Sequence, residues 1–168
     1  MLVLETARLR LRWITLDDAP FIVELVNDPA WLRHIGDRGV RNVEDAHAYL
    51  AKGPLDLYAK WGYGLYLAER MVDGAPVGMC GLVRREGLDD ADLGFALLPA
   101  FRSQGYAAEA SVAVLAHARS ALGMTRILAI VSPENLASIR LLERVGFAFE
   151  RMIQLGEKEP VMLFASAA

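Results

Sequence analysis

One loop combines small residues, an arginine and the start of a helix in a way that suits phosphate binding. The run Arg102-Ser103-Gln104-Gly105-Tyr106-Ala107 follows an apolar stretch that ends at Leu98-Pro99, and a helical pattern begins within it. The first N–H groups of a helix lack intrahelical partners, and the helix dipole favours negative charge there. Gly105 lets the backbone approach a phosphate closely, and Arg102 can add positive charge. We interpret the loop as a candidate anion site, with an ordinary strand-to-helix turn as the alternative.

A second pair of polar residues opens a later helical pattern. Asn135 and Ser138 precede the apolar positions Ile139, Leu142 and Val145. Asn135 is a good N-cap, so helix capping by itself explains the pair. A cap residue at a helix end that faces a ligand can also contact that ligand, so both roles stay open.

Other residues that often signal chemistry form no recognisable site in this sequence. Cys80 is the single cysteine, which excludes an internal disulfide and a multi-cysteine metal site. It lies in an apolar stretch without a placed histidine partner, so we interpret it as a core residue and not as a nucleophile. The three histidines, His34, His47 and His117, have no metal-ligand spacing, and we expect no bound metal.

Composition and charge narrow the class of protein. The chain has 168 residues, with 18 Lys and Arg against 21 Asp and Glu, so we expect one domain over 1–168 and no nucleic-acid partner. Arg8, Arg10 and Arg12 alternate with apolar residues, which is typical of a strand with one solvated face. No apolar run approaches the roughly 18 residues of a membrane span. Residues 1–5 do not resemble a signal peptide, so a cytoplasmic location is expected.

The candidate residues require a scaffold of strands and helices to position them. Hydrophobic periodicity predicts helices from Thr15 or Asp17 to Val26 and over 43–52, 107–122 and 135–145, while 31–41 stays unassigned. Strands are predicted over 8–14, 63–67, 77–83, 91–98, 127–131, from Phe147 onward and over 161–164. This order indicates an α/β fold, with one mixed seven-stranded sheet and helices on both faces.

Several motifs, in the right order, resemble the GNAT acetyltransferases. The loop 102–107 is similar to their Gln/Arg-x-x-Gly-x-Gly/Ala pyrophosphate loop, and Ala108-Glu109-Ala110 is similar to the start of the following helix in the RimJ/RimL-like branch. Asp92-Leu93-Gly94-Phe95-Ala96-Leu97-Leu98-Pro99 resembles that branch's Glu-Leu-Gly-Tyr-x-Leu-x-Pro strand. Residues 135–147 resemble its Asn-x-x-Ser and Leu-x-Lys-x-Gly-Phe pattern, and residues 5–12 resemble its Glu-Thr-x-Arg-Leu-x-Leu-Arg start. The resemblance covers nearly the whole chain.

The resemblance implies a GNAT fold, whose mostly antiparallel seven-stranded sheet splays between strands 4 and 5. Acetyl-CoA would lie in that gap, bound by the backbone of Ala96, Leu97 and Leu98, by the loop 102–107, and by Asn135 and Ser138. A backbone N–H would polarise the thioester carbonyl. A primary amine, either a protein N-terminus or a small molecule, would attack directly in a ternary complex. The alternative from another class is a GNAT module that binds acetyl-CoA without turnover.

The resemblance also implies catalytic roles. Asp92 replaces the branch's usual Glu and is the candidate proton acceptor, with a solvated strand-end carboxylate as the alternative. Many GNAT enzymes protonate the leaving thiolate with a tyrosine, but Leu142 stands at that position, so Ser138 is expected near the coenzyme sulfur. Trp31 is a substrate candidate on the acceptor side. The branch often forms dimers, so the resemblance admits a homodimer, but the sequence leaves the oligomeric state and the identity of the amine open.

Overall fold

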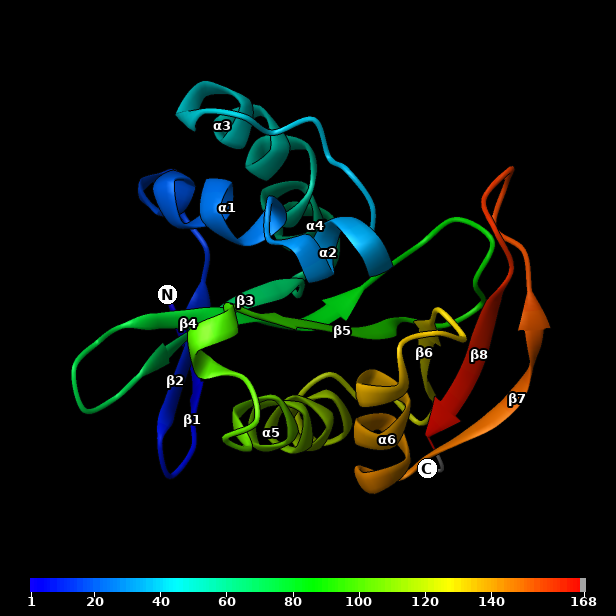
Figure 1. Ribbon diagram of the computed structural model, residues 1–168. Helices are drawn as coiled ribbons and strands as arrows, with labels where there is room; N and C mark the ends of the chain where they lie inside the picture. Colours follow the sequence, from blue (N-terminus) through cyan, green and yellow to red (C-terminus); the bar gives the residue numbers. More distant parts are fainter. Residues whose placement is uncertain (167–168) are drawn as a thin grey trace.

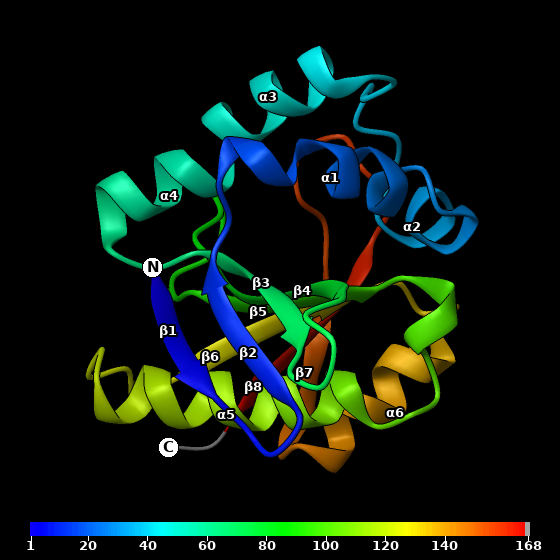
Figure 2. The same ribbon diagram turned by 90° about the vertical axis from the view of Figure 1, so that its left-hand side faces the viewer.

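In the computed structural model, which describes residues 1–166, eight strands form one sheet with helices on both faces (Figures 1 and 2). Neighbouring strands are antiparallel except β5 and β6, and the order across the sheet is β1-β2-β3-β4-β5-β6-β8-β7. The strands are β1 Leu2–Glu5, β2 Leu9–Trp13, β3 Leu65–Arg70, β4 Pro76–Val83, β5 Asp92–Leu97, β6 Ile127–Val131, β7 Phe147–Ile153 and β8 Val161–Ser166.

The predicted count of seven strands is one too low, because β1 was not expected. This four-residue edge strand has no regular alternation of buried and exposed positions. It is held by antiparallel pairing with β2, in which Glu5 lies opposite Arg10. A short edge strand that depends on its partner gives little periodic signal in its own sequence.

Four helices cover one face of the sheet and two cover the other (Figure 1). The first group is α1 Ala19–Val26, α2 Pro29–His34, α3 Val43–Lys52 and α4 Pro54–Trp61; the second is α5 Tyr106–Ser120 and α6 Leu136–Arg144. Two short 3-10 helices, η1 Leu16–Asp18 and η2 Pro99–Phe101, precede α1 and α5. None of the helices within residues 1–166 is both long and apolar enough to cross a membrane.

Two of these helices, α2 and α4, were not predicted. The Asp28 carboxylate accepts hydrogen bonds from the backbone N–H groups of Ala30 and Trp31, and Pro29 occupies the first turn of α2. Gly53 ends α3, and Pro54 directly after it begins α4. Proline is favoured at the first position of a helix because its missing N–H would have no intrahelical partner there.

The two faces of the sheet bury separate hydrophobic clusters. Successive side chains of a strand point to opposite faces, so β5 contributes to both clusters. Phe95 and Leu97 pack in the cluster beneath α5, which also contains Val114 and Leu115. Ala96 packs in the cluster beneath α1–α4, which includes Trp31. Strand β5 therefore presents one set of side chains to each layer of helices.

The sheet opens between β5 and β6, as expected between the fourth and fifth predicted strands. The two strands run parallel and pair at Asp92 and Leu128, where the Leu128 N–H donates to the Ala91 carbonyl over 2.9 Å. In the described part of the chain, the register of β5 against β6 contains no second pair. The C-terminal part of β5 is therefore paired with β4 on one edge and left open on the other.

Candidate functional site

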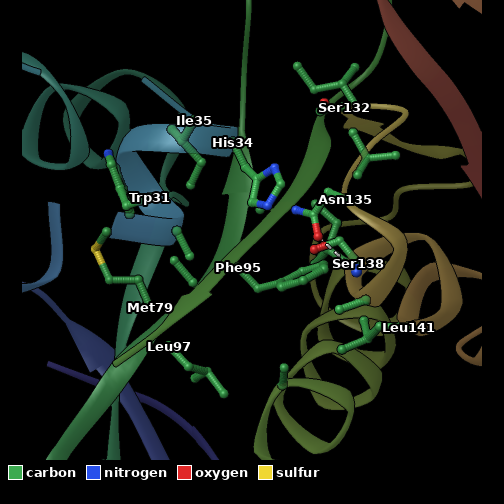
Figure 3. A pocket seen from close by; sticks show the side chains of 18 of the residues that line it. Trp31, His34, Ile35, Met79, Phe95, Leu97, Ser132, Asn135, Ser138 and Leu141 are labelled. Atoms are coloured by element: carbon green, nitrogen blue, oxygen red, sulfur yellow. Dashed lines mark hydrogen bonds between the residues drawn. The ribbon is translucent and has the colours of Figure 1, made fainter. Parts of the chain in front are cut away.

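A cavity of about 840 Å³ lies where β5 and β6 part, and residues from both faces of the sheet line it. Figure 3 shows Trp31 and His34 of α2, and Ile35 directly after this helix, on one side of this space. Asn135, Ser138 and Leu141 lie on the other side, and Phe95 and Leu97 of β5 lie between the two groups. The volume is within the range typical of pockets for small ligands and cofactors.

The free edge of β5 turns backbone groups toward the cavity. The Leu98 N–H donates to the Val77 carbonyl of β4 over 2.9 Å, with Gly78 opposite Leu97 in the register. Because hydrogen-bonding direction alternates along an antiparallel strand, the N–H groups of Phe95 and Leu97 point away from β4 and toward the gap. Phe95 was missed by the sequence analysis, which considered only 96–98; once the register is known, strand alternation identifies it.

The backbone contact predicted for Leu98 is not supported. Its N–H is bonded to Val77, and its carbonyl accepts a hydrogen bond from the Phe101 N–H over 3.0 Å. Both groups are therefore used within the protein, because the chain turns into η2 immediately after this residue. Ala96 lines the cavity from the face covered by α1–α4, and Leu97 remains the predicted backbone candidate.

The loop 102–107 has the local geometry of an anion site. Gly105 adopts a left-handed conformation with φ of 84°, which glycine tolerates best, and α5 starts at the next residue. Ser103 also has a positive φ, of 59°. Ser103, Tyr106 and Ala107 line the cavity beside the N-terminus of α5, whose first N–H groups have no intrahelical acceptor. Gln104 instead bonds the Ala100 carbonyl over 2.9 Å and does not line the cavity.

Arg102 lines the cavity, but its charge is already balanced. Its guanidinium donates to the buried Asp28 carboxylate and, over 2.9 and 3.1 Å, to the Leu97 carbonyl. Asp28 is the residue that caps α2. Arg102 therefore joins the end of β5 to α2, and less of its charge is available to a phosphate than the sequence suggested. Sequence reasoning missed Asp28, although its place before Pro29 fits a helix cap.

The N-terminal segment braces the same loop. The Glu109 carboxylate of α5 accepts from Thr6 Oγ1 over 2.6 Å and from Arg8 Nε over 2.6 Å. Arg8 also donates to the Gln104 carbonyl over 2.9 Å, and its guanidinium lies 4.4 Å from the centre of the Tyr106 ring. Burial raises the pKa of Glu109, but the hydrogen bonds from Thr6 and Arg8 outweigh it and hold the pKa below the ordinary value. The carboxylate therefore stays charged and holds Arg8, which in turn binds the loop 102–107.

Asp92 is buried, so its interpretation as a solvated carboxylate is wrong. It is 1% exposed, and both of its carboxylate oxygens accept from Arg85 Nε over 3.0 Å. Burial raises the pKa of Asp92, and the charge and hydrogen bond of Arg85 oppose the rise without cancelling it. Asp90, two residues before Asp92, pairs with Arg126 over 3.0 Å. Burial is thus the cause of the shift.

Asn135 and Ser138 lie together on the opposite wall of the cavity. The Asn135 Oδ1 accepts a hydrogen bond from the Ser138 N–H over 3.3 Å, which is the predicted helix cap (Figure 3). Both residues line the cavity. Leu142, one turn further along α6, is buried and carries no acid. Capping and ligand contact are therefore compatible at this helix end.

The α1–α4 side of the cavity contains polar groups from α2, the α2–α3 loop, α3 and the β4–β5 connection. Trp31 is 6% exposed and lines the cavity, and its indole N–H has no hydrogen-bond partner among residues 1–166. Tyr49 of α3, Arg38 and Arg85 line the same space. Burial raises the pKa of Tyr49, and the nearby charges of Arg38 and Arg85 oppose this rise. Tyr49 was not predicted as a site residue, because it lies on the apolar face of α3 and belongs to no motif.

Cys80 lies in the core and does not line the cavity. Its Sγ is 3.8 Å from Ser111 Oγ, and burial raises the pKa of its thiol to about 12. A thiol with this pKa is protonated at neutral pH, so it is not a nucleophile. Across residues 1–166, no three His, Cys, Asp or Glu side chains are grouped so that they could hold a metal ion.

Comparison with known proteins places the chain among acetyltransferases. Residues 8–148 match the family described as "Acetyltransferase (GNAT) domain". "Uncharacterized N-acetyltransferase YoaA" of Bacillus subtilis (strain 168) is 29% identical over 156 residues, which cover 90% of this chain and 86% of YoaA. "Uncharacterized N-acetyltransferase YnaD" of the same organism is 27% identical over 145 residues, covering 86% of this chain and 82% of YnaD.

Solved structures share the fold over the whole chain. A protein of Bordetella pertussis assigned to the GnaT-family acetyltransferases superposes with a TM-score of 0.82 at 27% identity, covering 99% of each chain. RimL, a ribosomal L7/L12 alpha-N-protein acetyltransferase solved in complex with coenzyme A, gives a TM-score of 0.82 at 20% identity. That match covers 99% of this chain and 98% of RimL, and at this identity it is a similarity of fold.

Proposed function

We propose, from the premise that this chain belongs to the GNAT acetyltransferase family, that it transfers the acetyl group of acetyl-CoA to a primary amine. The family and the N-acetyltransferase class predicted from the sequence are confirmed by the match over 8–148 and by the named relatives. The observation that carries the proposal is the open edge of β5 beside the N-terminus of α5. One cavity adjoins both features.

The residues present fit acetyl-CoA. The first turn of α5 and the left-handed Gly105 offer backbone N–H groups to a pyrophosphate. The N–H groups of Phe95 and Leu97 offer hydrogen bonds to an extended amide chain, as a neighbouring strand would. Asn135 and Ser138 close the opposite wall. Acetyl-CoA would supply the activated acyl group, and the protein would supply position and polarisation.

The transfer forms one N–C bond and breaks one C–S bond, and no enzyme nucleophile is needed. A backbone N–H of the β5 edge polarises the carbonyl that the amine attacks. The attacking amine must lose a proton, and Asp92 accepts it through water because burial has raised its pKa toward the working range. After the N–C bond forms, the nitrogen must lose a second proton, and this proton would pass to the sulfur as the C–S bond breaks, giving an amide and a free thiol. Ser138, on the wall across from β5, would donate a hydrogen bond to the departing sulfur.

The test is a screen of amines with acetyl-CoA, in which the release of free coenzyme A thiol is measured. The panel holds peptides with free N-termini, polyamines, aminoglycosides and amino acids, because the fold does not determine the acceptor. Acetyl-CoA binding is measured separately by calorimetric titration. Saturable binding together with thiol release for one class supports the proposal.

Two results would overturn different parts of it. Binding without thiol release from any amine class would indicate a module that binds acetyl-CoA without turnover. Absence of acetyl-CoA binding would remove the coenzyme assignment itself. Both outcomes are interpretable because binding and turnover are measured on the same preparation, with its melting temperature recorded.

A further inference from the structure

The α1–α4 side of the cavity, here called the acceptor side, carries an unusual balance of charge for an acidic protein. It is lined by Trp31, His34, Arg38, Tyr49, Arg85 and Asp92. The whole chain has a formal net charge of −3. With the paired Asp28 and Arg102, which also line the cavity, this side nevertheless contains three guanidinium groups and two carboxylates. The local charge is therefore opposite in sign to that of the chain, which makes it informative about the ligand.

The carboxylates near the acceptor side already have partners. Asp92 accepts from Arg85 Nε, and Asp28 accepts from Arg102 and from two N–H groups of α2. Arg38 has no ion pair or hydrogen bond to any residue among 1–166, and Arg85 uses only its Nε in such bonds. Cationic donors are therefore available on this side, whereas its carboxylates are engaged.

Two neutral donors accompany these cations. The Tyr49 hydroxyl lies close enough to Arg38 and Arg85 that both charges oppose the rise in its pKa. The Trp31 indole N–H is buried beside the cavity without a partner. A buried N–H without a partner costs about 1–3 kcal/mol, so a ligand that accepts from it would gain this energy. Donors from α2, the α2–α3 loop, α3 and the β4–β5 connection thus surround one space.

We propose that the acceptor amine carries a carboxylate close to its amino group, and that Arg38, Arg85, Tyr49 and Trp31 bind this carboxylate. The inference rests on the proposed function, because it names the substrate class of the same site. An α-amino acid has this chemistry, and so does the N-terminus of a peptide with an acidic residue near its start. A polyamine would bring further positive charge toward two guanidinium groups and is disfavoured.

The experiment compares amines that differ in the carboxylate alone. Amino acids are measured against their α-carboxamides, and peptides with Asp at the second position against the same peptides with Asn. Spermidine is the polycation in the panel. Charge-assisted hydrogen bonds contribute about 1.5–3 kcal/mol, so kcat/KM should be about 10-fold or more higher for the carboxylate member of the preferred pair. The amino-acid and peptide arms distinguish the two sources.

Two substitutions assign the effect to the acceptor side. Arg38→Gln should raise the KM of the carboxylate acceptor about 10-fold or more and leave that of its carboxamide unchanged. Trp31→Phe keeps a ring in the core but removes the N–H, and it should raise the same KM by a smaller factor. Acetyl-CoA affinity should not change in either variant. Arg33→Gln is the matched control, because Arg33 is exposed on α2 and does not line the cavity.

The proposal fails if the carboxamide or spermidine is acetylated as well as the carboxylate, or if Arg38→Gln affects both members of a pair equally. In that case thiol release with other amines still supports the proposed function. Absence of thiol release from every amine contradicts the proposed function instead. Melting temperatures of the variants separate a lost contact from a lost fold.

Discussion

The two sides of the cavity offer different kinds of groups to a ligand: backbone groups on one side and side chains on the other. On the α5–α6 side, the contacts proposed for the coenzyme are mainly to backbone groups: the β5 edge, the left-handed Gly105 and the start of α5. On the acceptor side, the proposed contacts are to side chains from α2, the α2–α3 loop, α3 and the β4–β5 connection. A backbone site requires glycines and a helix start at fixed spacing, whereas a side-chain site can use many residues. The α5–α6 side can therefore be recognised from a sequence motif, whereas the acceptor side has no such motif.

The largest effect is expected at Gly105, on the α5–α6 side of the cavity. Gly105→Asp should reduce acetyl-CoA affinity by at least about 100-fold, because it adds a carboxylate at the proposed phosphate site and strains a left-handed backbone. A Cβ there would also lie 3.2 Å from Arg8 Nη2. Calorimetric titration with acetyl-CoA measures the loss.

Gly123→Asp is the control for this substitution. Gly123 has a φ of 67° and lies beyond the other end of α5, with open space where a Cβ would be added. The variant carries similar backbone strain and the same charge, so its affinity should stay close to that of the parent protein. Equal affinity in a folded Gly105→Asp variant would refute the loop assignment.

The next largest effect is expected at Asp92, the first residue of β5, which lies between the two sides of the cavity. The pKa of Asp92 is raised by burial, so the carboxylate forms at a higher pH than an ordinary Asp and only then accepts a proton. Activity controlled by this group should fall as the pH drops through that raised pKa. Asp92→Asn should lower kcat about 100-fold and remove this acidic limb of the profile.

Two other outcomes at Asp92 have distinct meanings. Weaker acceptor affinity at every pH would make Asp92 a counter-ion for the ammonium, without a proton-transfer role. Unchanged rate and affinity would mean that the amine loses its proton to solvent. The pH profile is measured with the preferred acceptor at saturating acetyl-CoA, so that binding of the coenzyme does not mask the limb.

A smaller effect is expected at the far wall. Ser138→Ala should lower kcat about 10-fold, because the departing sulfur loses a hydrogen-bond donor, with little change in acetyl-CoA affinity. Equal turnover in Ser138→Ala, with chemistry rate-limiting, would leave Ser138 as a structural residue.

Asn135→Ala, which removes the cap of α6, should lower the free energy of unfolding by about 1 kcal/mol.

The smallest effect is expected in the core, away from both sides. The pKa of Cys80 is raised to about 12, so the thiol stays protonated below that pH and is inaccessible to reagents. Iodoacetamide at pH 8 should leave the folded protein unlabelled and fully active, and should label it in denaturant. Labelling of the folded protein with loss of activity would indicate a covalent intermediate and contradict direct transfer.

The sequence predicted the parts of the fold whose periodicity is strong. The helix over 43–52 and the strand over 127–131 were predicted with their observed bounds. The edge strand β1 and the helices α2 and α4 were missed, because short elements depend on caps and partners more than on periodicity. At the site, the turn at Gly105 before a helix and the helix cap at Asn135 could be predicted from residue type and spacing. The engagement of Arg102 by Asp28 could not, because it joins residues far apart in the sequence.

The bond between Arg102 and Asp28 also limits how this protein can change its substrate over evolutionary time. Asp28 caps α2 and also binds Arg102 of the loop 102–107, so its loss would damage both sides of the cavity. The residues that follow it, such as Trp31 and Arg38, have no such double role. Drift or directed evolution can therefore exchange these positions and leave Asp28 fixed. Libraries that seek a new acceptor should vary the segment after Asp28 and retain Asp28 itself.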